Sequence, residues 1–101
     1  MSVQVTSSPN AADAVIRVEG RFDFRMNQDF RKCYEALGGA TKRITIDLSK
    51  VESIDSSALG MLLMMRDKVA GDGKNIRLTN ANPTVKRVLT IAKFDALFTI
   101  V

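Results

Sequence analysis

Histidine and tryptophan are absent from this chain of 101 residues, and cysteine occurs once, at Cys33. Without histidine the chain lacks the commonest protein metal ligand and the usual general base at neutral pH. One cysteine can neither form an internal disulfide nor complete a zinc site. A catalytic serine would need an activating base, and the sequence points to no particular lysine for that role. We therefore expect no metal, no cofactor and no enzymatic activity.

Long apolar runs are missing as well. No stretch approaches the roughly 20 apolar residues that span a bilayer. Residues 1–5 have neither the basic start nor the apolar segment of a secretory signal. These features, together with the lone cysteine, predict a protein of the reducing cytoplasm that is not held in a membrane.

The basic charge of the chain is scattered. Its 15 lysines and arginines outnumber 11 acidic residues, for a net charge of +4, but no basic run exceeds two residues. Neither a zinc-finger spacing nor an aromatic RNA-binding motif is present. We expect no direct binding to nucleic acid, whereas an acidic protein partner would use the same charge equally well.

The order of apolar and polar residues predicts a single α/β domain over residues 1–101. Alternation predicts strands at 3–6, 14–19, 43–49 and 75–79. Helical spacing predicts helices at 26–37 and 61–70, ended by the glycines at 38–39 and 71–73. A third helix should begin at Asn82-Pro83, a cap followed by proline. Residues 94–101 are compatible with either a short helix or a strand.

This pattern has the order β-β-α-β-α-β-α. The short first connection suggests an antiparallel hairpin, and the later alternation of strands with helices implies parallel neighbours. We therefore expect a mixed, mostly parallel β-sheet of about four to five strands with about three to four helices.

The most informative segment is residues 54–60, Ile-Asp-Ser-Ser-Ala-Leu-Gly, which stands between a predicted strand and a predicted helix. Aspartate and serine cap helix N-termini because their oxygens accept from N–H groups that lack an intrahelical partner. Side chains at such a βα junction also face solvent beyond the carboxyl ends of the strands. Asp55 and Ser56 are thus either caps alone or an accessible chemical site.

Residues 46–60 resemble the STAS domain, in particular the small free-standing anti-sigma factor antagonists of bacteria. The matching residues are the run 46–49, Val51 and the segment 54–60, followed by an apolar helix. Gly20 followed three residues later by Asp23 is similar to the ending of the family's second strand. The element order fits too, and the resemblance covers essentially the whole chain.

The resemblance implies partner switching. An unmodified antagonist binds an anti-sigma factor and so releases the sigma factor that was sequestered. A serine kinase, often the anti-sigma factor itself, phosphorylates the first serine of the pair, and a PP2C-type phosphatase reverses this. Carried over by position, the phosphorylated residue is Ser56, with Ser57 as a weaker alternative.

The partner surface implied by the resemblance has Asp23 and Asp55 beside the serine. Ser57, Gly60 and Met64 extend the predicted surface along the following helix, where an exposed thioether suits an adaptable contact. Ala58 stands where the family commonly has glycine, which raises the question of whether its methyl group alters a close contact with the partner.

Two other functions fit the same residues. STAS proteins also serve as scaffold subunits of lipid-transport ABC systems, where the domain supports an ATPase and need not be phosphorylated. The intact Asp-Ser-Ser segment favours the antagonist over this alternative. A regulatory domain of an anion transporter is a weaker fit, because we find no membrane segment.

Overall fold

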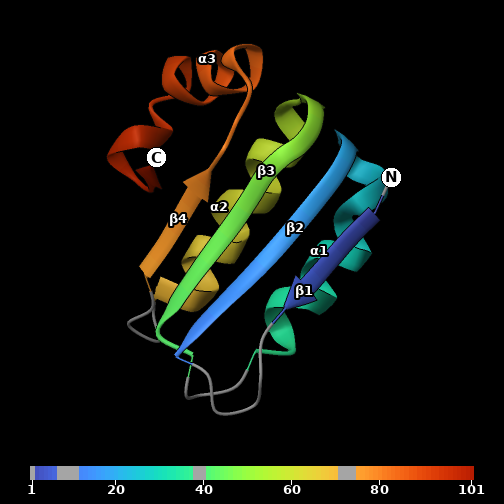
Figure 1. Ribbon diagram of the computed structural model, residues 1–101, viewed down its shortest axis with the longest axis vertical. Coiled ribbons are helices and arrows are strands. Elements are labelled where there is room, and N and C mark those ends of the chain that lie inside the picture. The colour runs from blue at the N-terminus through green and yellow to red at the C-terminus, as the bar shows by residue number, and fades with distance from the viewer. Residues whose placement is uncertain (1, 7–11, 38–40, 71–74) are drawn as a thin grey trace.

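The structure is a computed structural model that describes residues 2–6, 12–37, 41–70 and 75–101. Within these residues it contains one five-stranded sheet, three α-helices and two short 3-10 helices (Figure 1). In chain order the elements are β1 (Ser2–Thr6), β2 (Asp13–Phe22), η1 (Phe24–Met26), α1 (Asn27–Glu35), β3 (Arg43–Ile54), α2 (Ser56–Ala70), β4 (Asn75–Thr79), α3 (Pro83–Ile91), η2 (Phe94–Ala96) and β5 (Thr99–Ile100).

The strands lie in the sheet in their chain order, β1-β2-β3-β4-β5. β1 is antiparallel to β2, and each later strand is parallel to the one before it. The predicted mixed, mostly parallel sheet is therefore confirmed. The C-terminal residues, for which helix and strand were both open, form η2 followed by β5. The glycine stops predicted at 38–39 and 71–73 lie outside the described residues.

The core lies between the sheet and the helices α1 and α2, which run side by side behind it in Figure 1. Every second residue points into this layer from Ala14 to Val18 in β2 and from Ile44 to Leu48 in β3, as a period of two requires. The strands contribute buried Ile16 and Ile46 among others, and the helices contribute Phe30, Leu62 and Met65. None of the helices in the described ranges is long and apolar enough to cross a membrane.

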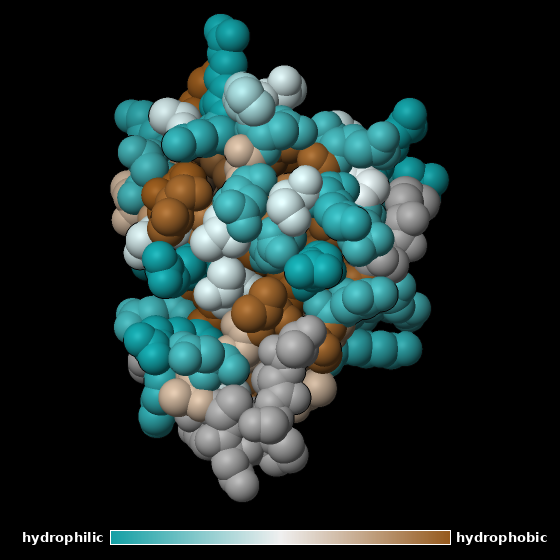
Figure 2. Space-filling model, in the orientation of Figure 1, coloured by the Kyte–Doolittle hydropathy of each residue, from teal (hydrophilic) through white to brown (hydrophobic). Residues whose placement is uncertain are grey.

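The opposite face of the sheet is mostly hydrophilic, as Figure 2 shows from the side of Figure 1. Here Arg17 of β2 pairs with Asp47 of β3, with 3.2 Å between Nε and Oδ2. Burial raises the pKa of the Asp47 carboxyl, but hydrogen bonds from Ser49, Asn80 and Arg17 lower it by more. The net result is a pKa below the ordinary value, so Asp47 is ionised and its ion pair with Arg17 links β3 to β2.

β2 and β3 are both longer than the sequence predicts. β3 was expected to end at residue 49 but continues to Ile54, and β2 continues from residue 19 to Phe22. The two extensions pair with each other, through Gly20 and Val51 and finally through Phe22 and Ile54. Pairing between strands therefore outweighs the weak local pattern, and both strands end at the same edge of the sheet.

The start of α3 agrees with the prediction. The Asn82 Oδ1 atom accepts a hydrogen bond from the Val85 N–H at 2.8 Å, and Pro83 occupies the first turn. The Asn82 Nδ2 atom also donates to the Val51 carbonyl at 3.1 Å. One side chain thus caps α3 and attaches it to β3.

We expect Asn82→Ala to lower the free energy of unfolding by about 1–2 kcal/mol, because the cap and the contact with β3 are lost together. Urea denaturation measures the change. Thr84→Ala, at an exposed position of the same first turn, is the matched control and should stay within about 0.5 kcal/mol of the wild type. Equal stabilities of the two variants would contradict the assigned role of Asn82.

Candidate functional site

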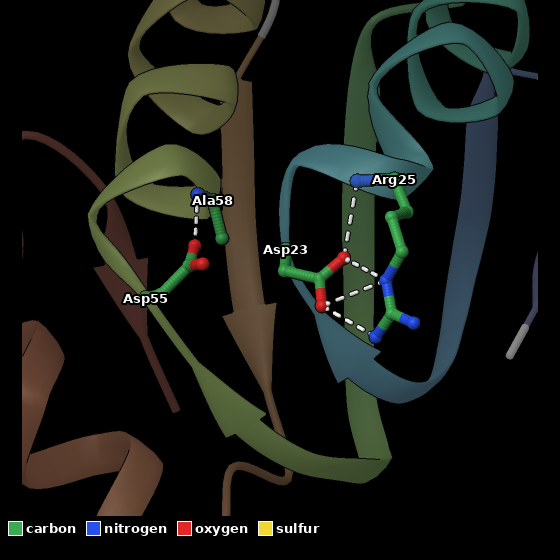
Figure 3. A network of polar contacts seen from close by, with 4 residues as sticks. All are labelled: Asp23, Arg25, Asp55 and Ala58. Carbon is green, nitrogen blue, oxygen red and sulfur yellow. Dashed lines mark hydrogen bonds and ion pairs between the residues drawn. The ribbon is translucent and has the colours of Figure 1, made fainter.

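Two acidic turns lie next to each other at the carboxyl edge of the sheet. Asp23 directly follows β2 and Asp55 directly follows β3, and the last residues of these parallel strands, Phe22 and Ile54, are register partners. Figure 3 shows both carboxylates at this edge, each at the start of a helical turn. The sequence-predicted residues Asp23 and Asp55 are therefore brought together.

Asp55 is the N-cap of α2. Its Oδ1 atom accepts a hydrogen bond from the Ala58 N–H at 3.0 Å, and its carbonyl accepts from the Leu59 N–H at 3.1 Å. This geometry decides between the two residues that the sequence offers as caps, because Ser56 lies inside the helix as its first residue. α2 also begins five residues before the predicted start at Met61, since the cap precedes the apolar stripe.

Ser56 and Ser57 occupy the first two positions of α2 and are both exposed. Among the hydrogen bonds of the described residues, none involves either hydroxyl. Backbone N–H groups of a first helical turn lack intrahelical partners and face the positive end of the helix dipole. A phosphate on either hydroxyl would lie near these donors, which is a favourable place for an anion.

Asp23 is less open than the sequence prediction assumed. Its Oδ1 atom accepts from the Arg25 N–H at 3.0 Å, and the Arg25 Nη2 atom lies 2.7 Å from Oδ2. The side chain of Asp23 is only 16% exposed. The hydrogen bond from the Arg25 side chain, opposed by some desolvation, holds the pKa of the Asp23 carboxyl below its ordinary value. Asp23 is thus an ionised cap of η1 that is already paired.

A groove of about 220 Å³ lies next to the serines, between η1 with the start of α1 and the first turns of α2. The sequence predicts three of its residues, Ser57, Gly60 and Met64, as partner contacts. It is lined by Phe24, Asn27, Ser57, Gly60, Met61 and Met64. Phe24 and Met64 are 69% and 59% exposed, so two large apolar residues of the groove face solvent.

Phe24 and Asn27 were not predicted as part of the site. In the sequence, Phe24 stands before the helical stripe of the predicted helix at 26–37, and this was the only sign of a different role. Gly60 lines the groove, and a Cβ atom built there would meet no heavy atom within 4 Å. Packing inside the chain therefore does not require glycine at this position.

Ala58 does not alter the surface. Its exposed fraction is 0%, and it packs in the core beneath α2. Its methyl group therefore has no access to a partner, and the exchange of glycine for alanine concerns packing alone.

A second, larger cavity of about 430 Å³ lies away from the serines, at the other end of the sheet. Arg66 of α2, Asn75 of β4 and Asp95 of η2 are among its lining residues. The Arg66 Nε atom donates to the Leu97 carbonyl at 3.1 Å and so ties α2 to the C-terminal segment. In the described ranges no group of three or more cysteine, aspartate or glutamate side chains is placed to hold a metal ion.

The chain belongs to the STAS domain family, because residues 5–100 match the family model described as "Mlab, STAS domain". A STAS-domain containing protein of Pseudomonas aeruginosa (strain UCBPP-PA14) is 40% identical over 100 residues, which are 99% of this chain and 99% of that protein.

The solved structures that resemble this fold include anti-sigma factor antagonists. A candidate antagonist from Thermotoga maritima superposes with a TM-score of 0.79 at 21% identity, covering 97% of this chain and 84% of that one. The antagonist SpoIIAA from Bacillus, in its unphosphorylated form, gives a TM-score of 0.72 at 19% identity, covering 99% and 87%. At these identities the likeness shows the STAS fold.

The cap assignment predicts that substitutions of Asp55 and Ser56 change the stability of the chain differently. Asp55→Ala should lower the free energy of unfolding by about 1 kcal/mol, because the Ala58 N–H loses its acceptor. Ser56→Ala should stay within about 0.5 kcal/mol of the wild type. Ser56→Asp should be as stable or slightly more stable, because an acidic side chain in the first turn favours the helix. Differential scanning calorimetry of the three variants tests this, and a loss of several degrees in Ser56→Asp would contradict it.

Proposed function

We propose that this STAS-domain protein is an anti-sigma factor antagonist that acts by partner switching in the cytoplasm. With Ser56 unmodified it binds an anti-sigma factor or a serine kinase of that class. Phosphorylation of Ser56 releases the partner, and a PP2C-type phosphatase restores binding. The chain itself performs no catalysis and contacts neither nucleic acid nor membrane. The main support is the place of Ser56, exposed at the start of α2 and adjacent to an apolar groove.

The site suits a switch that leaves the fold intact. A phosphate on Ser56 adds a charge of roughly −1.5 to −2 at neutral pH. The residues of α2 that hold the core, such as Leu62 and Met65, lie on the opposite side of the helix from Ser56. The modified hydroxyl stays in water, so the charge costs the free chain little.

The same charge is costly in a complex. Ser57, which directly follows Ser56, lines the groove with Phe24 and Met64. A partner that covers this groove must remove water from its rim, and an unpaired phosphate there loses hydration without compensation. The carboxylate of Asp55 stands at the same edge and adds to the repulsion of any acidic group on the partner. Phosphorylation therefore weakens binding and not folding.

The other predicted contacts have separate roles in this proposal. Ser57, Gly60 and Met64 form the α2 side of the covered surface, as they line one groove. Asp55 acts by holding the start of α2, since its Oδ1 atom is engaged with the Ala58 N–H. Ser57 is the weaker phosphate acceptor, because its side chain lines the groove and Ser56 is not among the lining residues.

Affinity capture from lysate of the source organism, with mass spectrometry, tests this function. Wild-type and Ser56→Ala proteins should both retain an anti-sigma factor or serine kinase, and Ser56→Asp should retain it at least about tenfold less. Thr99→Asp, at an exposed position of β5 beside the second cavity and away from the serines, is the charge control and should bind like the wild type.

Two results would contradict the proposal. Capture of membrane ATPase components that is the same for wild type and Ser56→Asp would support the alternative, a scaffold subunit of a lipid-transport ABC system. Phosphopeptide analysis that finds the modification only on Ser57 would transfer the switch to the neighbouring residue.

A further inference from the structure

The larger cavity, of about 430 Å³, lies where the edge of the sheet is incomplete. β5 pairs only with Arg77 and Leu78 of β4, so among the described residues Asn75 and Ile76 have no register partner on that side. The chain enters β5 from η2, and the cavity is the space that remains between η2, the start of β4 and Arg66 of α2. Its volume is within the range of small-molecule sites, roughly 300–1,000 Å³.

Arg66 supplies a cation that is held in place. Its Nε atom donates to the Leu97 carbonyl at 3.1 Å, and the residue is only partly exposed. A guanidinium has five N–H donors, of which this bond uses one. Among the hydrogen bonds and ion pairs of the described residues, none involves its two terminal nitrogens. These nitrogens form a planar fork that binds a carboxylate through two parallel hydrogen bonds.

Asp95 brings the opposite charge to the same cavity. It is an exposed residue in the first turn of η2, and no ion pair of the described residues joins it to Arg66. Asn75 adds a neutral amide, and its backbone is fixed because its N–H donates to the Lys42 carbonyl at 2.9 Å. Polar side chains from three different elements therefore line one cavity, and its cation and its anion are not bonded to each other.

Apolar residues form another part of the wall. Ile76 and Phe98 line the cavity and belong to the core, and the ring of Phe98 packs on Phe94 with centroids 5.3 Å apart. Leu97 also lines the cavity and is 39% exposed. Such a wall favours contact with an apolar group and disfavours a charge.

We propose that this cavity binds a free apolar α-amino acid in its zwitterionic form. The carboxylate of the ligand pairs with the terminal nitrogens of Arg66, and its ammonium group pairs with Asp95. Its apolar side chain lies against Leu97 and Phe98. Charge selects this class of ligand, because Asp95 repels a simple anion and Arg66 repels a simple cation. A zwitterion instead forms a charge-assisted hydrogen bond at each end.

The cavity is separate from the serines. Arg66 follows Ser56 by ten positions in α2, which is about 15 Å along a helix that rises about 1.5 Å per residue. Binding at this cavity therefore needs no partner and can be measured on the free chain, whether or not Ser56 is modified.

Titration of the isotope-labelled chain with leucine and two of its fragments, followed by amide NMR spectra, tests this assignment. Leucine carries both charges, 4-methylpentanoate lacks the ammonium group, and 3-methylbutylamine lacks the carboxylate. Leucine should bind with a Kd of about 1 mM or below, and each fragment should bind at least about tenfold more weakly. The shifted amides should lie in η2 and at the start of β4, and the Ser56 amide should not shift.

Substitutions should distinguish the two ends of the ligand. Asp95→Asn should remove the preference for leucine over 4-methylpentanoate, and Arg66→Gln should remove the preference over 3-methylbutylamine. Each should weaken leucine binding about tenfold or more. Arg66→Lys, which keeps the charge but not the planar fork, should bind with an intermediate affinity. Asp67→Asn and Arg77→Gln, at exposed positions outside the cavity lining, are the matched controls and should bind like the wild type.

Several results would overturn the site. If Arg66 serves only to tie α2 to Leu97, Arg66→Gln lowers the melting temperature and Asp95→Asn binds leucine normally. Equal binding of leucine and 4-methylpentanoate by the wild type would remove the role of the ammonium group. Absence of leucine binding, or shifts centred on the groove beside Ser57, would also refute the site. Asp95→Asn keeps the bond to the Leu97 carbonyl, so its melting temperature should match the wild type and its effect reports on binding alone.

Discussion

The parallel pairing of β2 with β3 determines the whole site. The two strands stay paired through Phe22 and Ile54, so both chains leave the sheet at the same level. Each then turns into a helical segment whose first polar group is an aspartate, Asp23 for η1 and Asp55 for α2. If either strand ended earlier, the two turns would separate and the groove between η1 and α2 would not exist. The surface is therefore a consequence of sheet register.

α2 serves the core and the surface at once. Its inner side contributes Ala58, Leu62 and Met65 to the packed layer, and its outer side presents Ser56 and Met64 to solvent. Because the cap at the start of the helix is a different residue from the serine, a charge can be added to Ser56 without removing a structural bond. This separation of roles makes a surface switch compatible with a stable fold.

Much of the fold follows from local patterns in the sequence, and the details of the site do not. Alternating and helical spacing predict the element order and the mixed sheet, and the Asn82-Pro83 pair predicts the start of α3. The extension of β3 to Ile54 is not predicted, because it depends on pairing with a strand that is distant in the chain. Phe24 was missed for a similar reason. Its place in the groove depends on the packing of η1 beside α2, two elements that are far apart in the chain.

The most direct test is a comparison of amide NMR spectra before and after phosphorylation of Ser56. Our account predicts shifts confined to the first turns of α2 and to η1, with the amides of the central strands unchanged and the melting temperature preserved. Shifts that spread through β2 and β3, or a marked loss of stability, would show that the phosphate acts on the fold. In that case the account of a surface switch would be wrong.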